Sequence, residues 1–383
     1  MSQRHLQFQD RVNLGSYYTP PEIVNLAWQM INPPLDPRTT IIDTACGYGD
    51  FLKNHRQSIG CDIDRTAISI AKKNNDKAQF FQANALHNVS REKFGISPQS
   101  KLIVVGNPPY NDKTSLIRQK IKSESFDIDE DLTSRDLGIS FLRSYNKLQA
   151  DLVCILHPLS YLIKPTNFKS LKGFAANYKL VAGQLISSST FKESAKLTPF
   201  PIVIAFYQRD RRGMEYDFIR SFRFDVHGGG CFCLSDFDYI TNYISKYPSK
   251  RHQPIPDDSL FFWTMRDINA LKRNRTFVKN YSNNTIVVDK RKLSYYAYVD
   301  VFKRNLYRLP FYLGNCDIPI DDKRFRQYKH YFISDTIGHH PFLEKHFQID
   351  PIEKEQAKTE IDRYFKLLLG KHHAVLPAFD NSR

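Results

Sequence analysis

The residues with the most distinctive chemistry are four consecutive ones, Asn107-Pro108-Pro109-Tyr110. They follow an apolar run, residues 102–105, and so lie where a predicted strand ends, which is where open α/β sheets bind ligands. The Asn107 amide oxygen and the Pro108 carbonyl can each accept an N–H of an exocyclic amino group, such as that of adenine. This pairing aims the nitrogen lone pair at a methyl donor, while the two prolines stiffen the loop and Tyr110 can stack on the base. The alternative is a proline-rich turn after a strand.

A second candidate site begins with residues 43–49, which directly follow the predicted strand at residues 39–42. Two glycines in this loop allow the backbone to approach a ligand closely. The next strand ends about 20 residues on, at Asp62, where a carboxylate can hold both ribose hydroxyls of a nucleoside. We interpret Asp64 instead as a helix N-cap. A lone Gly-x-Gly is most often an ordinary turn, so the spacing to Asp62 is what favours a nucleoside site.

Together these segments resemble the N6-adenine DNA methyltransferases of type II restriction–modification systems. The order matches the class in which cofactor motifs come first, the NPPY motif follows and a target-recognition domain comes last. The resemblance runs from about Leu14 to Gln208 and includes the segment Gly15-Ser16-Tyr17-Tyr18-Thr19-Pro20. It implies S-adenosyl-L-methionine as the cofactor and an adenine flipped out of duplex DNA as the substrate. It implies no metal.

The resemblance also assigns roles to individual residues. Thr19 would contact the methionine part of the cofactor, Phe141 would cover the cofactor adenine, and Phe191 would pack against the flipped base. A core position is the alternative for Phe191. The implied catalytic residues are Asn107, Pro108, Pro109, Tyr110 and Phe191. The implied cofactor-binding residues are Tyr18, Thr19, Asp43, Ala45, Cys46, Gly47, Asp62, Ile63, Asn84, Ala85 and Phe141.

Two positions depart from the family pattern. Thr44 stands where the family commonly has Pro, which removes some loop rigidity but no ligand. Asn84 stands where the family usually has an Asp that faces the amino group of the cofactor adenine. An amide oxygen accepts the same hydrogen bond without charge, so we expect a weaker interaction with the cofactor. His157 could serve as a general base, but the proposed transfer needs none at that position.

The elements that must position these residues alternate along the first 208 residues. Several of the predicted strands are continuous apolar runs, as in strands buried on both faces. Strands are predicted over residues 39–42, 58–61, 78–82, 101–105, 152–156, 180–186 and 202–207, and helices over 21–31, 64–74 and 135–149. We interpret Thr19 as the N-cap of the first helix. The fold class is therefore α/β, a Rossmann-like domain with a mixed, mostly parallel sheet.

A polar break at residues 209–213 separates the catalytic domain, residues 1–208, from the expected DNA-recognition domain, residues 209–383. The net charge of +15 favours a polyanionic partner. Residues 272–308 hold ten basic and two acidic side chains interleaved with aromatic ones. We interpret this segment and residues 323–329 as candidate phosphate contacts.

Six scattered cysteines are too few for a disulfide scaffold. Cys231 and Cys233 lie near His227, but no second pair has zinc-finger spacing, so we expect no metal site. We interpret residues 228–230 as a glycine-rich turn that enters a strand. No apolar run is long enough to cross a bilayer, and residues 1–10 lack the apolar core of a secretion signal. A cytoplasmic location without membrane contact is the expectation.

The expected partners are double-stranded DNA, bound by a monomer, and a cognate restriction endonuclease as a functional partner. Three alternatives stay open. An RNA or protein-glutamine methyltransferase can share the NPPY loop, but generally places its recognition domain before the cofactor motifs. A cytosine-N4 methyltransferase more often has Ser at the position of Asn107. A non-catalytic DNA-binding specificity subunit is favoured by Asn84 and disfavoured by the intact 107–110 loop.

Overall fold

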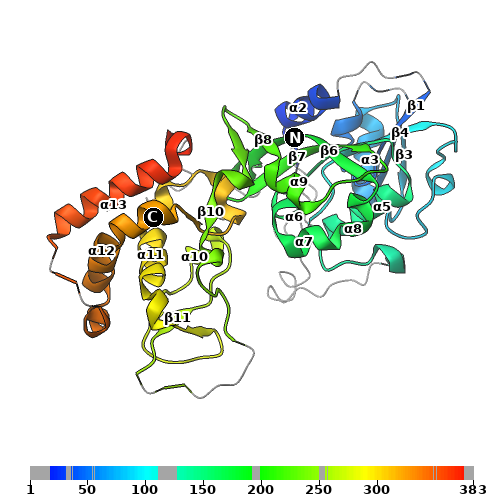
Figure 1. Cartoon of the computed structure of the whole chain (residues 1–383). Coiled ribbons are helices and arrows are strands. Elements are labelled where there is room, and N and C mark those ends of the chain that lie inside the picture. The colour runs from blue at the N-terminus through cyan, green and yellow to red at the C-terminus, as the bar shows by residue number, and fades with distance from the viewer. Residues whose placement is uncertain are drawn as a thin grey trace. The chain divides into compact units, whose positions relative to one another are not determined.

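The structure is a computed structural model, and it divides into two compact units, Met1–Leu234 and Ser235–Arg383 (Figure 1). The residues that it describes are 18–31, 36, 38–53, 55, 57–110, 127–191, 199–249, 255, 256, 258–347, 349, 350 and 352–374. Residues 15–17 of the predicted motif at residues 15–20 lie outside the described residues, whereas every individually predicted site residue lies within them.

The first unit is built on one nine-stranded sheet with the order β3-β2-β1-β4-β5-β7-β6-β8-β9. Its strands are β1 (Thr39–Asp43), β2 (Ser58–Asp62), β3 (Gln79–Gln82), β4 (Lys101–Gly106), β5 (Leu152–Pro158), β6 (Tyr178–Ser187), β7 (Pro201–Arg209), β8 (Arg223–Val226) and β9 (Cys231–Cys233). The first five strands pair in parallel, and β7 runs antiparallel between β5 and β6. The expected α/β class with a mixed, mostly parallel sheet is thereby confirmed.

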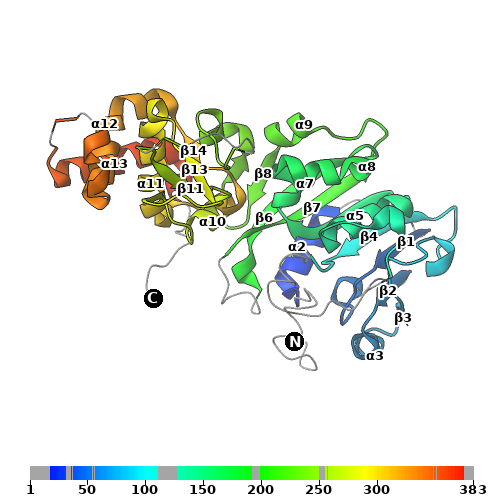
Figure 2. The same ribbon diagram turned by 90° about the horizontal axis from the view of Figure 1, so that it is seen from below.

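Helices cover both faces of this sheet, with α2 and α3 on one face and α5, α7 and α8 on the other (Figure 2). The helices of the first unit are α2 (Pro21–Ile31), α3 (Arg65–Asn74), α5 (Leu137–Lys147), α6 (Ser160–Ile163), α7 (Pro165–Ser170), α8 (Lys172–Ala175) and α9 (Tyr216–Ser221). The Asp64 carboxylate caps α3 by accepting hydrogen bonds from the amides of Thr66 and Ala67, as predicted.

The core of this unit lies around the central strands β4, β5 and β7. Residues 102–105, 153–156 and 202–205 are at most 3% exposed, which explains their continuous apolar sequences. Burying one such Val, Leu or Ile side chain stabilises the fold by roughly 1.5–3 kcal/mol relative to leaving it exposed. The central strands are therefore a rigid base for the loops at their ends.

The predicted boundary between the two parts, near residue 209, differs from the structural one at Leu234. After the turn at residues 209–213 the chain returns to the sheet and adds β8 and β9 as its last two strands. In β8 exposed and buried positions alternate, because Arg223 and Asp225 face solvent while Phe224 and Val226 face the core. With only two apolar residues out of four, β8 lacks the continuous apolar run by which the other strands were predicted. The glycines at residues 228–230 form the turn before β9, as predicted.

The second unit combines small sheets with helices. The three-stranded sheet has the order β12-β11-β13, and a two-stranded sheet pairs β10 with β14. Its elements are β10 (Asp238–Tyr239), β11 (Phe261–Trp263), α10 (Ile268–Leu271), β12 (Phe277–Val278), β13 (Thr285–Val287), α11 (Leu293–Arg304), β14 (Pro319–Ile320), α12 (Asp322–His339) and α13 (Lys354–Leu369). Aromatic rings of α11, α12 and α13 pack together in its core, as when Tyr298 contacts Phe332 and Tyr364. Across the described residues, no helix is long and apolar enough to cross a membrane.

Candidate active site

The predicted site residues come together at the carboxyl ends of three neighbouring parallel strands. Asp43 is the last residue of β1, Asp62 is the last residue of β2, and Asn107 follows β4. The register aligns these ends, because Asp43 lies beside Gly60, and Ile42 lies beside Val104. The Gly47 amide donates a hydrogen bond of 2.8 Å to the Asp62 carboxylate and thereby links the loops after β1 and β2.

Asn107 has an incomplete set of hydrogen bonds. Its amide nitrogen Nδ2 donates to the hydroxyl of the buried Thr19 at 3.1 Å. Its amide oxygen Oδ1 is buried and has no partner among the residues that the structure describes. A buried acceptor left unsatisfied costs about 1–3 kcal/mol, so a ligand that donates an N–H there would be favoured. Thr19 was predicted to cap α2, but it does not. The helix begins at Pro21, and the Thr19 hydroxyl accepts a hydrogen bond from Asn107 instead.

The loop that carries Tyr110 lies against the first turn of α5. A Cβ atom added at Gly138 would lie 3.2 Å from the Tyr110 Cβ and 2.5 Å from the Tyr161 hydroxyl, so a larger residue there would displace the Tyr161 side chain. Asp136 caps α5 by accepting from the Gly138 amide at 3.0 Å, and it also accepts a hydrogen bond from Tyr161. These three positioning residues were missed in the sequence, although an Asp before a helix is a cap pattern.

Asp43 is buried beneath the NPPY loop. A Cβ atom at Gly106 would lie 2.6 Å from its Oδ1, so the glycine before Asn107 makes room for this carboxylate. Burial raises the pKa of Asp43 to about 8, against the lowering effect of the Ala45 amide, and Asp62 and Asp50 raise it further. A cation bound nearby would favour the ionised carboxylate.

Asp62 and Ile63 place a polar and an apolar side chain next to each other in the sequence at the end of β2. The two Asp62 oxygens accept hydrogen bonds from the amides of Gly47 at 2.8 Å and Asp64 at 2.9 Å. Each oxygen keeps a second lone pair for a hydroxyl donor. Ile63 is 44% exposed, which is unusual for its type and leaves an apolar side chain available to a ring.

Asn84 connects two loops. Its Oδ1 accepts from the Leu86 amide at 3.0 Å, and its Nδ2 donates to the Asp127 carbonyl at 2.6 Å. Asp129 strengthens the same contact, because its amide donates to the Leu86 carbonyl at 2.9 Å and its carboxylate accepts from the Val89 amide at 3.0 Å. Asn84 therefore has a structural bond that an Asp could not make, since a carboxylate cannot donate.

The two predicted aromatic contacts lie in the core. Phe141 is 6% exposed on α5, with its ring 6.3 Å from that of Tyr145, and Phe191 is 1% exposed. Their contacts with a cofactor and with a base stay predictions. His157 is fully buried, its Nε2 lies 2.7 Å from the Tyr207 hydroxyl, and burial lowers its pKa to about 4. This environment agrees with the interpretation that His157 is no general base.

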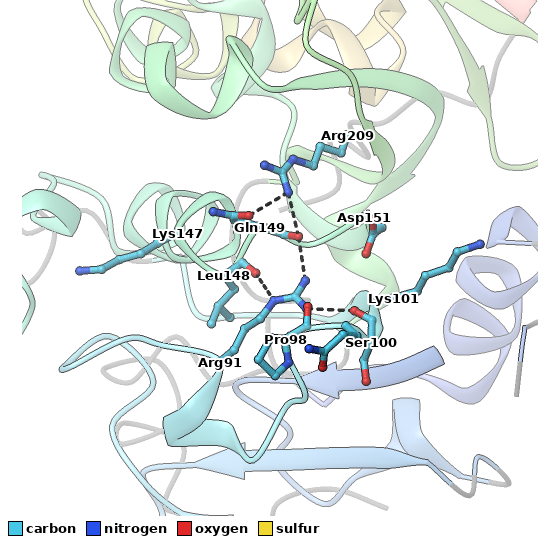
Figure 3. A pocket seen from close by; sticks show the side chains of 10 residues that line it. Arg91, Pro98, Ser100, Lys101, Lys147, Leu148, Gln149, Asp151 and Arg209 are labelled. Atoms are coloured by element: carbon cyan, nitrogen blue, oxygen red, sulfur yellow. Dashed lines mark hydrogen bonds between the residues drawn. The ribbon is translucent and has the colours of Figure 1, made fainter. Parts of the chain in front are cut away.

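A pocket of about 440 Å³ lies at the opposite end of the strands, around the starts of β4 and β5. There the Arg91 guanidinium reaches the backbone carbonyls of Leu148, Gln149 and Ser100 at 2.9–3.1 Å (Figure 3). Because its donors are directed at carbonyls, Arg91 joins two loops. The six residues of β4 put about 20 Å between this pocket and Asn107. Among the described residues, no group of three or more His, Cys, Asp or Glu could hold a metal ion.

Asn107, Asp43 and Asp62 lie within the segment of the chain that matches a known protein family. Residues 5–165 match the family model of N-6 DNA Methylase. This match covers less than half of the 383 residues and supports an N6 DNA methyltransferase family for the segment. It implies S-adenosyl-L-methionine as the cofactor. No curated protein matches the chain.

Solved structures align with about half of the chain. One is a modification subunit assigned to a type I restriction enzyme of Vibrio vulnificus, at 16% identity, with 55% of this chain and 47% of that chain covered and a TM-score of 0.40. Another is the DrdV–DNA complex, at 14% identity, with 58% and 29% covered and a TM-score of 0.42. A third is the tRNA (uracil-54, C5)-methyltransferase of Pyrococcus abyssi, at 16% identity, with 49% and 38% covered and a TM-score of 0.29. The chain therefore spans less than half the length of these three proteins.

Proposed function

We propose that this chain is a site-specific DNA methyltransferase that transfers a methyl group to the N6 atom of adenine in duplex DNA. The observation that carries the proposal is the buried Asn107 Oδ1, which lacks a partner among the described residues and lies at the end of β4. An amino group is the donor that the chemistry of the NPPY loop fits. The family-model match supports the N6 DNA methyltransferase class.

The cofactor would be held along the ends of β1 and β2. Asp62 would accept the ribose hydroxyls, Ile63 would contact the adenine ring, and the loop with Asp43 and Gly47 would bind the methionine part. S-adenosyl-L-methionine supplies an electrophilic methyl group on a sulfonium. The two lone pairs left on Asp62 and the exposed Ile63 side chain support this arrangement.

The target adenine would leave the base stack, because its amino group cannot reach a methyl donor inside the duplex. Asn107 Oδ1 and the Pro108 carbonyl accept its two N–H bonds, with Tyr110 and Phe191 against the ring. Thr19 holds the Asn107 amide in the required orientation through its 3.1 Å hydrogen bond. Catalysis then consists mainly of positioning and preorganised hydrogen bonds.

Recognition of DNA is assigned to the second unit, and protection of host DNA from a cognate restriction endonuclease is the proposed role. The excess of basic side chains in residues 272–308 supports a polyanionic partner. Monomeric action on DNA and a cytoplasmic location complete the proposal.

Two substitutions separate chemistry from cofactor binding. Asn107→Ala should lower kcat by about 10²- to 10³-fold, as the loss of one preorganised hydrogen-bonding group does, and leave the Kd of S-adenosyl-L-methionine nearly unchanged. Asp62→Ala should raise that Kd roughly 10- to 100-fold, because hydrogen bonds to a charged group contribute about 1.5–3 kcal/mol. Single-turnover methylation and titration calorimetry measure the two quantities.

Asp64→Ala is the matched control, since this neighbouring carboxylate caps α3. It should lower the stability of the protein by about 1 kcal/mol without changing the cofactor Kd. Full activity of the Asn107→Ala variant would refute the proposed role of the NPPY loop.

A further inference from the structure

The basic segment at residues 272–308 divides into an exposed part and an internal part. The cations of its C-terminal part are half-buried and bonded within the unit: Arg304 pairs with Asp300 and Asp335, and Arg308 pairs with Asp362. The cations of its N-terminal part, residues 272–292, are all exposed. These are Lys272, Arg273, Arg275, Lys279, Lys290, Arg291 and Lys292. With Asp289 as the only acidic residue in this range, residues 272–292 carry a local excess of +6.

Few of these exposed charges are neutralised within the protein. Lys290 pairs with Asp258 and Arg291 pairs with Asp289, but both pairs are exposed to solvent, which screens them and makes them weak. In the part of the chain that the structure describes, Arg273, Arg275 and Lys292 form no ion pair. The segment at residues 323–329 differs, because Arg324 and Arg326 pair with Asp321 and Asp322 at 2.8 Å.

Two strands of the three-stranded sheet, β12 and β13, lie within the same stretch of chain, and the sheet has one buried face. On that face Phe262, Phe277 and Ile286 are buried, and the Phe262 ring lies 5.1 Å from that of Tyr296 on α11. On the opposite face Phe261 pairs across the strands with Val278 and Val287, so these three side chains form one row.

Two side chains of this second face project into solvent. Val287 is 44% exposed, and Tyr281, whose ring lies 5.8 Å from that of Phe261, is 49% exposed. We call the set Phe261, Val278, Tyr281 and Val287 the outer face. Lys279 directly follows β12, so cations border this apolar surface along the chain. An apolar centre with a polar rim also occurs in protein interfaces, so it is the excess of +6 in residues 272–292 that favours a nucleic acid as the partner.

We propose that the outer face and the exposed cations of residues 272–292 form the surface on which the second unit binds duplex DNA. This inference rests on the proposed function and names the surface that it requires. Arg273 and Arg275 contact phosphates, while Tyr281 and Val287 contact sugars and base edges. Because phosphate contacts position and base contacts specify, the two groups of residues have separable effects.

The test measures the Kd of the full chain for duplex DNA by fluorescence anisotropy over a range of salt concentrations. Each phosphate contact contributes about 0.9 to the slope of log K against log salt. The double variant Arg273→Gln with Arg275→Gln should therefore reduce the magnitude of this negative slope by about 1.8. The control is Arg324→Gln with Arg326→Gln, which removes two exposed cations of α12 that pair with Asp321 and Asp322 and should reduce the magnitude of the slope by less than half as much.

Tyr281→Ala should keep the salt slope and reduce the preference for the recognised sequence over other DNA. An unchanged slope in the Arg273/Arg275 variant, with DNA methylation intact in the wild-type protein, would overturn the inference and leave the proposed function standing. Absence of DNA methylation by the wild-type protein would overturn both. Melting temperatures and cofactor Kd values that match the wild type would show that the exposed substitutions left both units folded.

Discussion

At the scale of single residues, Asp43 combines burial with a place in the candidate site. Its carboxyl group is 2% exposed, and burial raises its pKa to about 8, far above that of the unfolded chain. A group with a raised acid pKa takes up a proton on folding. Its contribution therefore favours the folded state at low pH and is lost as the pH rises from about 4 to about 8.

This linkage predicts the pH dependence of stability without cofactor. The contribution of Asp43 to the free energy of unfolding should fall by up to about 1.4 kcal/mol per pH unit between pH 5 and 8. Asp43→Asn cannot ionise, so this variant should lose stability less steeply over the same range. Urea unfolding at several pH values measures the difference. Parallel pH profiles for variant and wild type would contradict the burial argument.

Residue types at the site could be predicted from the sequence, whereas their partners could not. Asn107, Asp43 and Asp62 stand out because each ends a strand-like run. The bond from Asn107 to Thr19 spans 88 positions, and the bond from Asn84 to Asp127 spans 43. Pairings over such distances depend on the tertiary fold, so the amide at position 84 looked only like a weaker Asp.

At the scale of elements, the direction of the change in cofactor Kd in an Asn84 variant distinguishes two roles for this residue. If Asn84 were only a weaker Asp, Asn84→Asp would strengthen cofactor binding. The structure predicts the opposite, because the new carboxylate would face the Asp127 carbonyl, now 2.6 Å from Nδ2, and lose a hydrogen bond. We expect the Kd of S-adenosyl-L-methionine to rise by about threefold or more, from the loss of roughly 0.5–1.5 kcal/mol.

Calorimetric titration of Asn84→Asp against the wild type measures this change. Asp127→Ala is the control, since it removes an exposed side chain and keeps the carbonyl that Asn84 binds. A tighter cofactor complex in Asn84→Asp would show that the loop contact has no bearing on the site.

The elements themselves were predictable where the sequence pattern was strong. Strands β1 to β7 were predicted to within about two residues at each end, because they are apolar runs ended by polar residues. Strand β8 was missed, since the alternation of Arg223 and Asp225 with buried residues leaves no continuous apolar run. The start of α2 was predicted correctly, but its cap was not, because Thr19 has a distant partner.

At the scale of the whole molecule, the two units carry different features. The first unit contains the segment of recognisable family and the candidate site. The second unit contributes exposed charge. Its sequence gave the total of basic residues in 272–308 but not which of them are free, because Asp335 and Asp362, which neutralise Arg304 and Arg308, lie outside that segment.

The proposed function is methylation of adenine N6 in DNA. Its most direct test is transfer of labelled methyl from S-adenosyl-L-methionine to unmethylated duplex DNA, to RNA and to a protein substrate with an exposed glutamine, followed by nucleoside analysis. We predict label in DNA as N6-methyladenine, with the Asn107→Ala variant nearly inactive. Label only in RNA or protein, or no label with DNA still bound, would contradict the claim.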